Sequence, residues 1–322
     1  MKRKLKWVPW LALWVSILVQ SVSAAAFLVP VGQVVGLEIQ DGTVTVAAFD
    51  RELGHAAQEA GLQIGDQLLT VNKKVIHCAE DVSTALAGGQ KPVSLQIVRK
   101  EKIHTLTVTP SPTERGAKLG VYLKDSITGV GTVTWYDPES GRFGALGHGV
   151  STSGGSPASM EEGNIYDARI LSVRKGRTGA PGQLVGTLAG SEPTGSLEKN
   201  LPQGVFGRCK RGWQGNALPV APKNQVHPGK ASIRSTIQGQ MTGEYAVEIL
   251  KVYPNSGSTG RNLLLQITDP ALLSATGGIV QGMSGSPIIQ DGKIIGAVTH
   301  VLVGDPTRGY GIFIENMLDA AL

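Results

Sequence analysis

The sequence predicts a mainly β fold in two domains. Glycine is abundant at 43 residues, and Val, Ile and Thr recur in short runs broken by Gly and Pro, a composition that suits short strands joined by tight turns. A chain of 322 residues is long enough for two domains of ordinary size. Its hydrophobic content of 41% excludes a chain that is disordered throughout.

The N-terminal 26 residues have the pattern of an export signal. Four basic residues lie between positions 2 and 6, an apolar stretch follows, and Val22-Ser23-Ala24 ends it with small side chains. The stretch is somewhat short of the ~20 residues that a spanning helix prefers, but it is long enough to anchor. We therefore expect residues 1–26 to be a signal peptide or a membrane anchor helix, and the protein to be exported across the membrane or anchored in it.

The charge and the scattered histidines exclude two classes of function. The formal net charge is +5, but the N-terminal basic residues supply four of these charges and no basic helix follows, so no nucleic-acid partner is expected. Two cysteines and six histidines show no metal-ligand spacing, and no glycine pattern suits a phosphate, so neither a metal nor another cofactor is expected. Whether Cys78 and Cys209 pair is left open.

Residues 27–110 have the pattern of a small mixed domain. Residues 42–49 and 93–110 are predicted strands, the second a hairpin that turns near Lys100-Glu101, and residues 79–88 are a predicted helix. Between them, "EAGLQIGDQLLTVNKKVI" resembles the PDZ signature through Gly61, Leu62, Gly65, Asp66, Leu68, Val71, Asn72 and Ile76. An ordinary turn-strand-turn without peptide binding is the alternative.

The PDZ resemblance implies a groove in which a peptide adds as a strand to a sheet edge. The expected groove lies between a strand that begins in "GQVVGLEI" and the helix around Val82 to Leu86. The expected peptide-binding residues are Gly36, Leu37, Glu38 and Ile39. The occupant would be a peptide or the protein's own N-terminal segment. Pro110-Ser111-Pro112 is the expected linker to the next domain.

Residues 111–322 contain many short strand-like runs separated by Gly and Pro, which predicts an all-β barrel or sandwich. Near its end, Ser284 lies in Gly-Met-Ser-Gly-Ser-Pro, ahead of two apolar runs joined by Asp291-Gly292. A nucleophilic serine needs an exposed hydroxyl and two N–H groups aimed at the oxyanion. Glycines beside it permit such a backbone, and the predicted donors are the N–H groups of Gly282 and Ser284. A plain glycine-rich turn is the alternative.

A serine nucleophile needs a base within hydrogen-bond reach. His148 is flanked by glycines in "RFGALGHGV" and is the best candidate. His300 is a second candidate for the base, but it follows an apolar strand. Val298, Thr299 and His300 are expected to form a wall of the substrate pocket.

"GHG" followed by "GMSGSPI" and "GAVTH" resembles a chymotrypsin-type serine peptidase, which implies a double β-barrel. More closely, an export segment, a PDZ domain and then "FGALGHG…TDP…QGMSGSPIIQDGKIIGAVTHV…GYGIFIE" resembles the stage IV sporulation protein B peptidases. That resemblance implies a triad of His148, Asp269 and Ser284. Asp269 is the least secure member, and Asp167 competes with it for the role of orienting the histidine. Otherwise Asp269 would be a helix N-cap ahead of "PALLSA".

The same resemblance implies an exported signalling peptidase with possible self-cleavage, acting in the space between the two forespore membranes. Its substrate would be a membrane-embedded inhibitory protein, and cleavage would release an intramembrane protease that activates a mother-cell sigma factor. Two alternatives are a general quality-control protease of the cell envelope and a non-catalytic PDZ scaffold.

Overall fold

The computed structural model describes residues 26–322, except positions 90, 115, 153–154 and 258–259. The predicted signal or anchor segment therefore lies outside the described residues, apart from Ala26. Among the helices that are described, none is long and apolar enough to cross a membrane.

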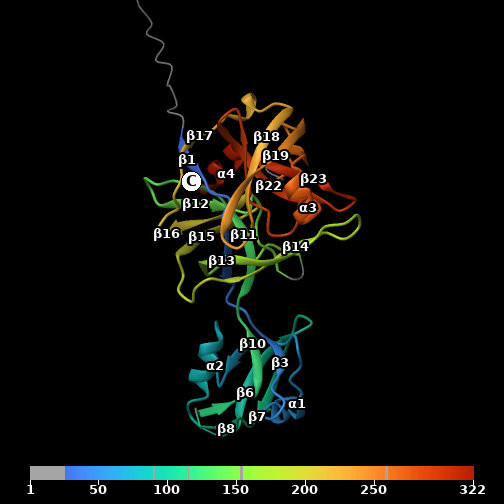
Figure 1. The fold of residues 1–322 in the computed structure, drawn as a ribbon. Helices are drawn as coiled ribbons and strands as arrows, with labels where there is room; N and C mark the ends of the chain where they lie inside the picture. Colours follow the sequence, from blue (N-terminus) through green and yellow to red (C-terminus); the bar gives the residue numbers. More distant parts are fainter. Residues whose placement is uncertain (1–25, 90, 115, 153–154, 258–259) are drawn as a thin grey trace, which may run out of the picture.

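The first of two β-barrels, barrel 1, lies at the centre of Figure 1. Its six strands pair in a ring that closes because β12 pairs with both β11 and β16. In ring order the strands are β2 (Val34–Gln40), β11 (Ile127–Tyr136), β12 (Arg142–Ala145), β16 (Gly204–Cys209), β15 (Gly195–Leu201) and β13 (Glu162–Arg174). Beside the ring lie β1 (Phe27–Pro30), β17 (Leu218–Pro219) and β14 (Gln183–Leu188).

The second barrel, barrel 2, is also closed and has six strands. They are β18 (Gly229–Gln238), β19 (Met241–Val252), β20 (Leu263–Ile267), β23 (Asp305–Phe313), β22 (Lys293–Leu302) and β21 (Pro287–Gln290). Asp291 and Gly292 join β21 to β22 with φ values of 50° and 73°, both positive as a two-residue hairpin turn of an Asp-Gly pair requires. Three short helices accompany it, η1 (Lys223–Gln225), α3 (Pro270–Thr276) and α4 (Ile314–Ala321).

The PDZ-like domain stands apart from the barrels in the lower part of Figure 1. Its sheet runs in the order β10-β3-β4-β6-β7, with β5 beside β4. The elements are β3 (Val44–Phe49), α1 (His55–Glu59), β4 (Gln67–Val71), β5 (Lys74–Val75), α2 (Ala79–Ala85), β6 (Val93–Arg99), β7 (Lys102–Val108), β8 (Ser111–Thr113), β9 (Gly116–Lys118) and β10 (Val121–Lys124). The turn at Lys100-Glu101, with φ values of 49° and 62°, confirms the predicted hairpin.

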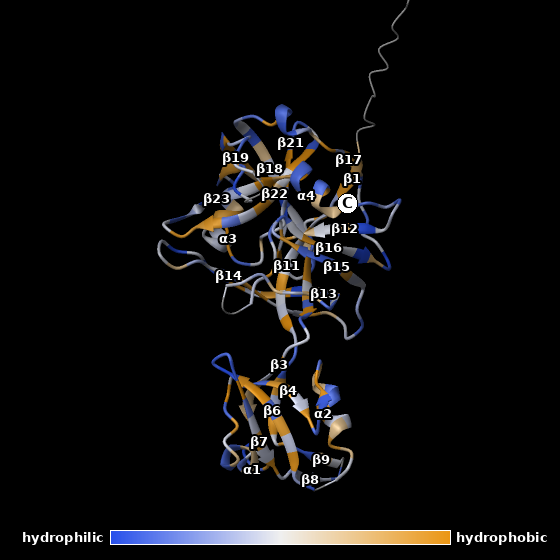
Figure 2. Ribbon diagram, turned by 180° about the vertical axis from the view of Figure 1, so that it is seen from behind, coloured by the Kyte–Doolittle hydropathy of each residue, from blue (hydrophilic) through white to orange (hydrophobic). Residues whose placement is uncertain are grey.

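Apolar residues recur along these strands, as the hydropathy colours of Figure 2 show. The buried ones form a core in each part. The PDZ-like core includes Leu68, Leu95 and Ile97, and the core of barrel 1 includes Ile39 and Phe143. Another core fills barrel 2 around Ile233, Leu265, Ile288 and Phe313. A mainly β fold with a PDZ-like domain and a double barrel is therefore confirmed.

The predicted domain boundaries, 27–110 and 111–322, differ from the structure. Strand β2 pairs on one side with β11 and on the other with β13, so residues 34–40 belong to barrel 1. At the other end, β10 pairs with β3 and completes the PDZ-like sheet. The domain is thus an insertion between β2 and β11. The predicted linker at 110–112 is wrong, because Ser111–Thr113 is strand β8, paired with β9.

This topology makes a prediction about two deletions. Removing residues 43–124 leaves Asp41, Gly42, Asp125 and Ser126 to connect β2 with β11, whose residues Ile39 and Ile127 are direct neighbours. Because a hairpin loop of this length is common, both barrels should still fold cooperatively, as circular dichroism and thermal unfolding would report. Removing residues 35–108 instead takes out β2 and should prevent barrel 1 from folding. A cooperative transition in the second variant would contradict this topology.

Candidate active site

A cavity of about 630 Å³ is lined by two of the three predicted catalytic residues, His148 and Ser284. His148 reaches it from the segment after β12 of barrel 1, and Ser284 from the turn before β21 of barrel 2. His300, near the C-terminal end of β22, also lines this cavity. The cavity is therefore built from both barrels, and each contributes one of the two residues.

The turn around Ser284 leaves this residue partly exposed, whereas Met283 and Gly285 on either side of it are buried. Gly282 and Gly285 have φ values of 99° and 97°, which L side chains rarely adopt, and a Cβ on Gly285 would collide with the carbonyl oxygen of Thr132. Ser284 is partly exposed, whereas Ser286 is fully buried. Only the first of these serines lines the cavity.

The predicted oxyanion donors are available in this turn. Within the part of the chain that the structure describes, no acceptor bonds to the N–H group of Gly282 or of Ser284. The Ser284 hydroxyl donates to the carbonyl oxygen of Thr299 at 2.7 Å, so it does not point to His148 in this state. A rotation about χ1 is needed before the histidine can accept its proton.

The hydrogen bond of His148 defines which ring nitrogen can act as a base. Its Nδ1 lies 2.9 Å from the carbonyl oxygen of Gly149. Because a carbonyl only accepts, Nδ1 carries the proton when this bond is made, and Nε2 is left with a lone pair. Burial lowers the pKa of His148 below its usual value, although the bond to Gly149 acts in the opposite direction. The imidazole is thus kept neutral and in the tautomer that a general base requires.

Asn200, at the end of β15, holds the segment that follows His148. Its Oδ1 accepts from the N–H of Val150 at 2.8 Å, and its Nδ2 donates to the carbonyls of Val150 at 3.0 Å and Ala158 at 2.9 Å. All three amide contacts are therefore made to the loop that carries the histidine. This role of Asn200 could not be predicted from the sequence, because a lone Asn before a turn is common.

The predicted pocket wall is only partly correct. His300 lines the cavity, and its ring centre lies 5.3 Å from that of His148. Burial, then His148 and Arg261, lower the pKa of His300. Val298 is fully buried in the core of barrel 2 and Thr299 is 2% exposed, so these two support the cavity from behind.

The structure does not place Asp269 beside His148, in disagreement with the predicted triad. Its carboxylate caps helix α3, accepting from the N–H of Leu272 at 3.0 Å, and also accepts from Ala246 at 3.3 Å. Tyr310 of β23 pairs with Leu264 on one side and with His300 on the other. Leu264 precedes Asp269 by five residues. Strand β20 runs on from Leu264 to Ile267 with a rise of about 3.3 Å per residue, so Asp269 lies beyond the end of this strand, on the order of 10 Å or more farther along. The structure thus agrees with the alternative in which Asp269 is a helix N-cap.

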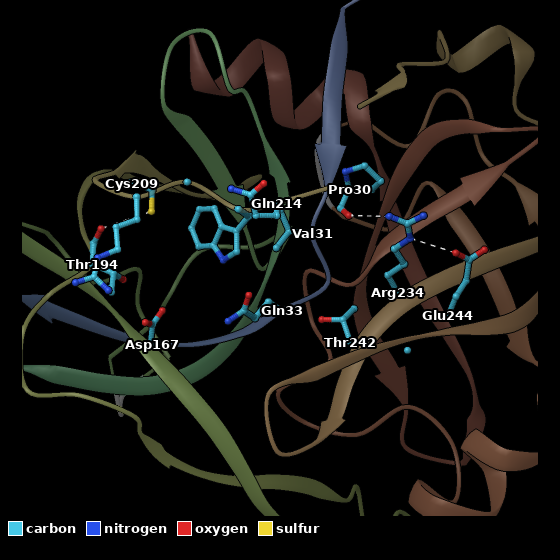
Figure 3. A pocket seen from close by; sticks show the side chains of 14 residues that line it. Pro30, Val31, Gln33, Asp167, Thr194, Cys209, Gln214, Arg234, Thr242 and Glu244 are labelled. Carbon is cyan, nitrogen blue, oxygen red and sulfur yellow. Dashed lines mark hydrogen bonds and ion pairs between the residues drawn. The ribbon is translucent and has the colours of Figure 1, made fainter. Parts of the chain in front are cut away.

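Asp167 does not reach His148 either. It lies on β13 and lines a different cavity, also of about 630 Å³, whose other walls include Pro30 of β1, Arg234 of β18 and residues 242–244 at the start of β19. Figure 3 shows Asp167 near Gln33 and Thr194, across this cavity from the ion pair of Arg234 with Glu244. Among the described residues, the carbonyl of Gly149 is the only acceptor bonded to His148.

The four residues predicted to bind a PDZ ligand line barrel 1 instead. Gly36, Leu37, Glu38 and Ile39 lie in β2, and Leu37 and Ile39 line the cavity with His148 and Ser284. Glu38 accepts a hydrogen bond from the Tyr166 hydroxyl at 2.7 Å, and this bond raises the pKa of Tyr166 to about 12. The prediction was wrong because a Gly-Leu pair also fits a strand buried between two neighbours.

The PDZ-like groove lies between β10 and α2. This cavity of about 360 Å³ is lined by Val82 and Leu86 on the helix side and by residues 117–123 on the strand side. Strand β10 is at the edge of its sheet, so one row of its backbone groups is open to strand addition. The signal in the sequence was Leu119-Gly120-Val121, a glycine turn directly before a strand, at the far end of the domain from the segment that was predicted.

Asp269 provides a direct test of the two roles considered for it. As a helix cap, Asp269→Asn should leave turnover and stability nearly unchanged because Asn caps equally well, and Asp269→Ala should cost about 1 kcal/mol of unfolding free energy. Urea denaturation and peptide cleavage would measure both. A fall in turnover of roughly 10⁴-fold in Asp269→Asn, with the fold intact, would instead support the triad role.

Three known proteins show limited similarity to the chain. The mitochondrial serine protease HTRA2 of Drosophila virilis is 41% identical over 58 residues, which span 18% of this chain and 14% of that protein. The active form of the Rv3671c protease from M. tuberculosis is 13% identical, with 60% of this chain and 72% of that chain covered and a TM-score of 0.38. The PDZ domain of the SdrC-like protein from Listeria monocytogenes is 14% identical, with coverages of 26% and 87% and a TM-score of 0.23. At these scores the structural similarities carry no argument by themselves.

The family comparison covers far more of the chain. The model of the SpoIVB peptidase S55 family matches residues 115–318, a span that begins inside the PDZ-like domain and includes every strand of barrel 2. This span is well over half of the 322 residues, and the chain therefore belongs to the SpoIVB peptidase S55 family and is a serine endopeptidase.

Proposed function

We propose that Ser284 is the nucleophile and His148 the general base of this peptidase, with the N–H groups of Gly282 and Ser284 as the oxyanion hole. The observation that carries the proposal is that both side chains line one cavity while these two N–H groups have no acceptor among the described residues. The neutral His148, with its Nδ1 proton directed at Gly149, supplies the base that a serine requires.

The proposed reaction begins when the Ser284 hydroxyl leaves the Thr299 carbonyl and turns to Nε2 of His148. Its oxygen attacks the peptide carbonyl carbon while Nε2 takes the proton, and the two N–H groups bind the oxyanion. The imidazolium then donates that proton to the leaving amine, and the acyl-enzyme forms. A water molecule, deprotonated by the same Nε2, attacks the ester carbonyl carbon. The bond from that carbon to Ser284 Oγ then breaks, and Nε2 returns its proton to Oγ, which releases the acid and restores the serine.

In this cycle the Gly149 carbonyl has part of the role that a carboxylate has in a full triad. It fixes the tautomer of His148 through a bond of 2.9 Å. As a neutral acceptor, it stabilises the imidazolium less than a charged carboxylate would. The proposed catalytic residues are therefore Ser284 and His148, with the backbone carbonyl of Gly149 orienting the histidine. Asp269 is the N-cap of helix α3.

The proposed substrate is a membrane-embedded inhibitory protein, whose cleavage releases an intramembrane protease that activates a late mother-cell sigma factor. Membership of a family named for a sporulation peptidase supports this role. The proposed location is outside the cytoplasm, in the space between the forespore membranes, reached through the N-terminal export or anchor segment. The open edge of β10 is the proposed docking site for a peptide of the substrate or of the protein's own N-terminal segment.

Active-site labelling tests the catalytic assignment. A fluorophosphonate should modify Ser284, and Ser284→Ala should lower peptide cleavage by more than about a thousandfold while the fold is retained. Ser286→Ala is the matched control, since its buried hydroxyl has no partner among the described groups and its loss should leave cleavage near the wild-type rate. An adduct on Ser286 would refute the assignment. Broad degradation of casein would favour the quality-control alternative.

The pH dependence of cleavage follows from the burial of His148. Only its neutral form can accept the serine proton, so kcat/KM should rise with pH as His148 loses its proton. Because burial lowers this pKa, the midpoint of the rise should lie below the ordinary histidine value of about 6.5. The measurement is kcat/KM for a peptide substrate between pH 4 and 9. A midpoint above that value would show that another group, or an unburied His148, controls the rate.

A further inference from the structure

Four consecutive carbonyl groups define the shape of the nucleophile turn, and each has a donor. The carbonyl of Gln281 accepts from Leu184 N–H of β14 at 2.8 Å, and that of Met283 accepts from Ser286 N–H at 3.0 Å. The other two, on Gly282 and Ser284, are both bound by Thr132 of β11. A trans peptide unit is planar, with its N–H opposite to its C=O, so these bonds also fix where the N–H groups of the turn point.

Thr132 makes its two contacts with different atoms. Its Oγ1 donates to the carbonyl of Gly282 at 2.7 Å, and its N–H donates to the carbonyl of Ser284 at 3.1 Å. The residue is fully buried, so water cannot replace these bonds. Its own carbonyl accepts from Leu146 N–H at 3.1 Å, two residues before His148. One residue of barrel 1 thus contacts both the serine turn and the segment that leads to the histidine.

The bond from the Thr132 hydroxyl has a specific target. It holds the peptide unit between Gly282 and Met283, which lies between the two proposed oxyanion donors, Gly282 N–H and Ser284 N–H. Gly282 has a φ of 99°, and glycine rotates more freely than any other residue. Without a donor on its carbonyl, this peptide unit can rotate, and the two N–H groups then no longer converge.

We infer that Thr132 is the positioning residue of the oxyanion hole, because its buried hydroxyl fixes the peptide plane between the two donors. This inference rests on the proposed function, in which Gly282 and Ser284 bind the oxyanion. Thr132 does not line the catalytic cavity, so its effect on the rate passes through the turn. Substrate binding in the ground state does not need the oxyanion donors, and kcat should therefore fall more than KM changes.

The test is the isosteric change Thr132→Val, compared with Thr132→Ser. The valine variant should lose between about tenfold and several-hundredfold in kcat, and as much in its rate of fluorophosphonate labelling, with little change in KM. The serine variant keeps the donor and should restore most of the rate. Thr134→Val is the matched control, since Thr134 is equally buried on the same strand and its hydroxyl has no partner among the described residues. It should cleave at the wild-type rate.

Three outcomes decide the inference. A folded Thr132→Val with wild-type kcat would overturn it, as would a Thr132→Ser variant that is as slow as the valine variant. If Thr132→Val does not fold, Thr132→Cys retains a weaker donor of similar size, and its rate should fall clearly below that of Thr132→Ser; equal rates would overturn the inference. An adduct that maps away from Ser284 in the wild-type protein would instead refute the proposed function, whatever the rates of the Thr132 variants.

Discussion

The pairing of β2 with β11 on one side and β13 on the other is the constraint on which the molecule depends. Six residue pairs join β2 to each neighbour, and without them barrel 1 would be an open sheet. Barrel 1 in turn carries His148, Asn200 and Thr132, while barrel 2 carries Ser284. A strand that precedes the PDZ-like domain in the sequence therefore decides whether the two halves of the active site meet.

Backbone groups orient the histidine and shape the serine turn at this site. The Gly149 carbonyl defines the tautomer of His148. The carbonyls of residues 281–284 are all bound, whereas the N–H groups of Gly282 and Ser284 have no acceptor among the described residues. Side chains such as Thr132 and Asn200 act on this backbone and do not reach the cleaved bond themselves. An arrangement of this kind lowers the cost of reorganisation during the reaction, because its dipoles are already oriented.

Local patterns in the sequence were sufficient to predict the Asp291-Gly292 hairpin and the mainly β fold, because each depends on neighbouring residues. Local patterns also selected Ser284 and His148, and the structure places both at one cavity. The strands that pair with one another in the sheets could not be predicted in the same way. The apolar run at residues 34–40 indicates a buried strand, but the sheet that receives it is decided by contacts with β11 and β13, far along the chain. The triad role of Asp269 was predicted from its match to the family motif. In the structure Pro270 begins helix α3 directly after it, and the Asp269 carboxylate caps this helix. Thr132 gave no signal because its role is defined by distant carbonyl groups.

The insertion of the PDZ-like domain also has a consequence for folding order. Pairing β2 with β11 closes a loop over residues 41–126, which for a flexible chain costs on the order of 4 kcal/mol in entropy. The inserted domain has its own core, and its first and last strands, β3 and β10, are antiparallel neighbours. Once this domain has folded, its two ends emerge side by side and the long loop behaves as a short one. The folded PDZ-like domain thus shortens the loop that must close before β2 and β11 can pair in barrel 1.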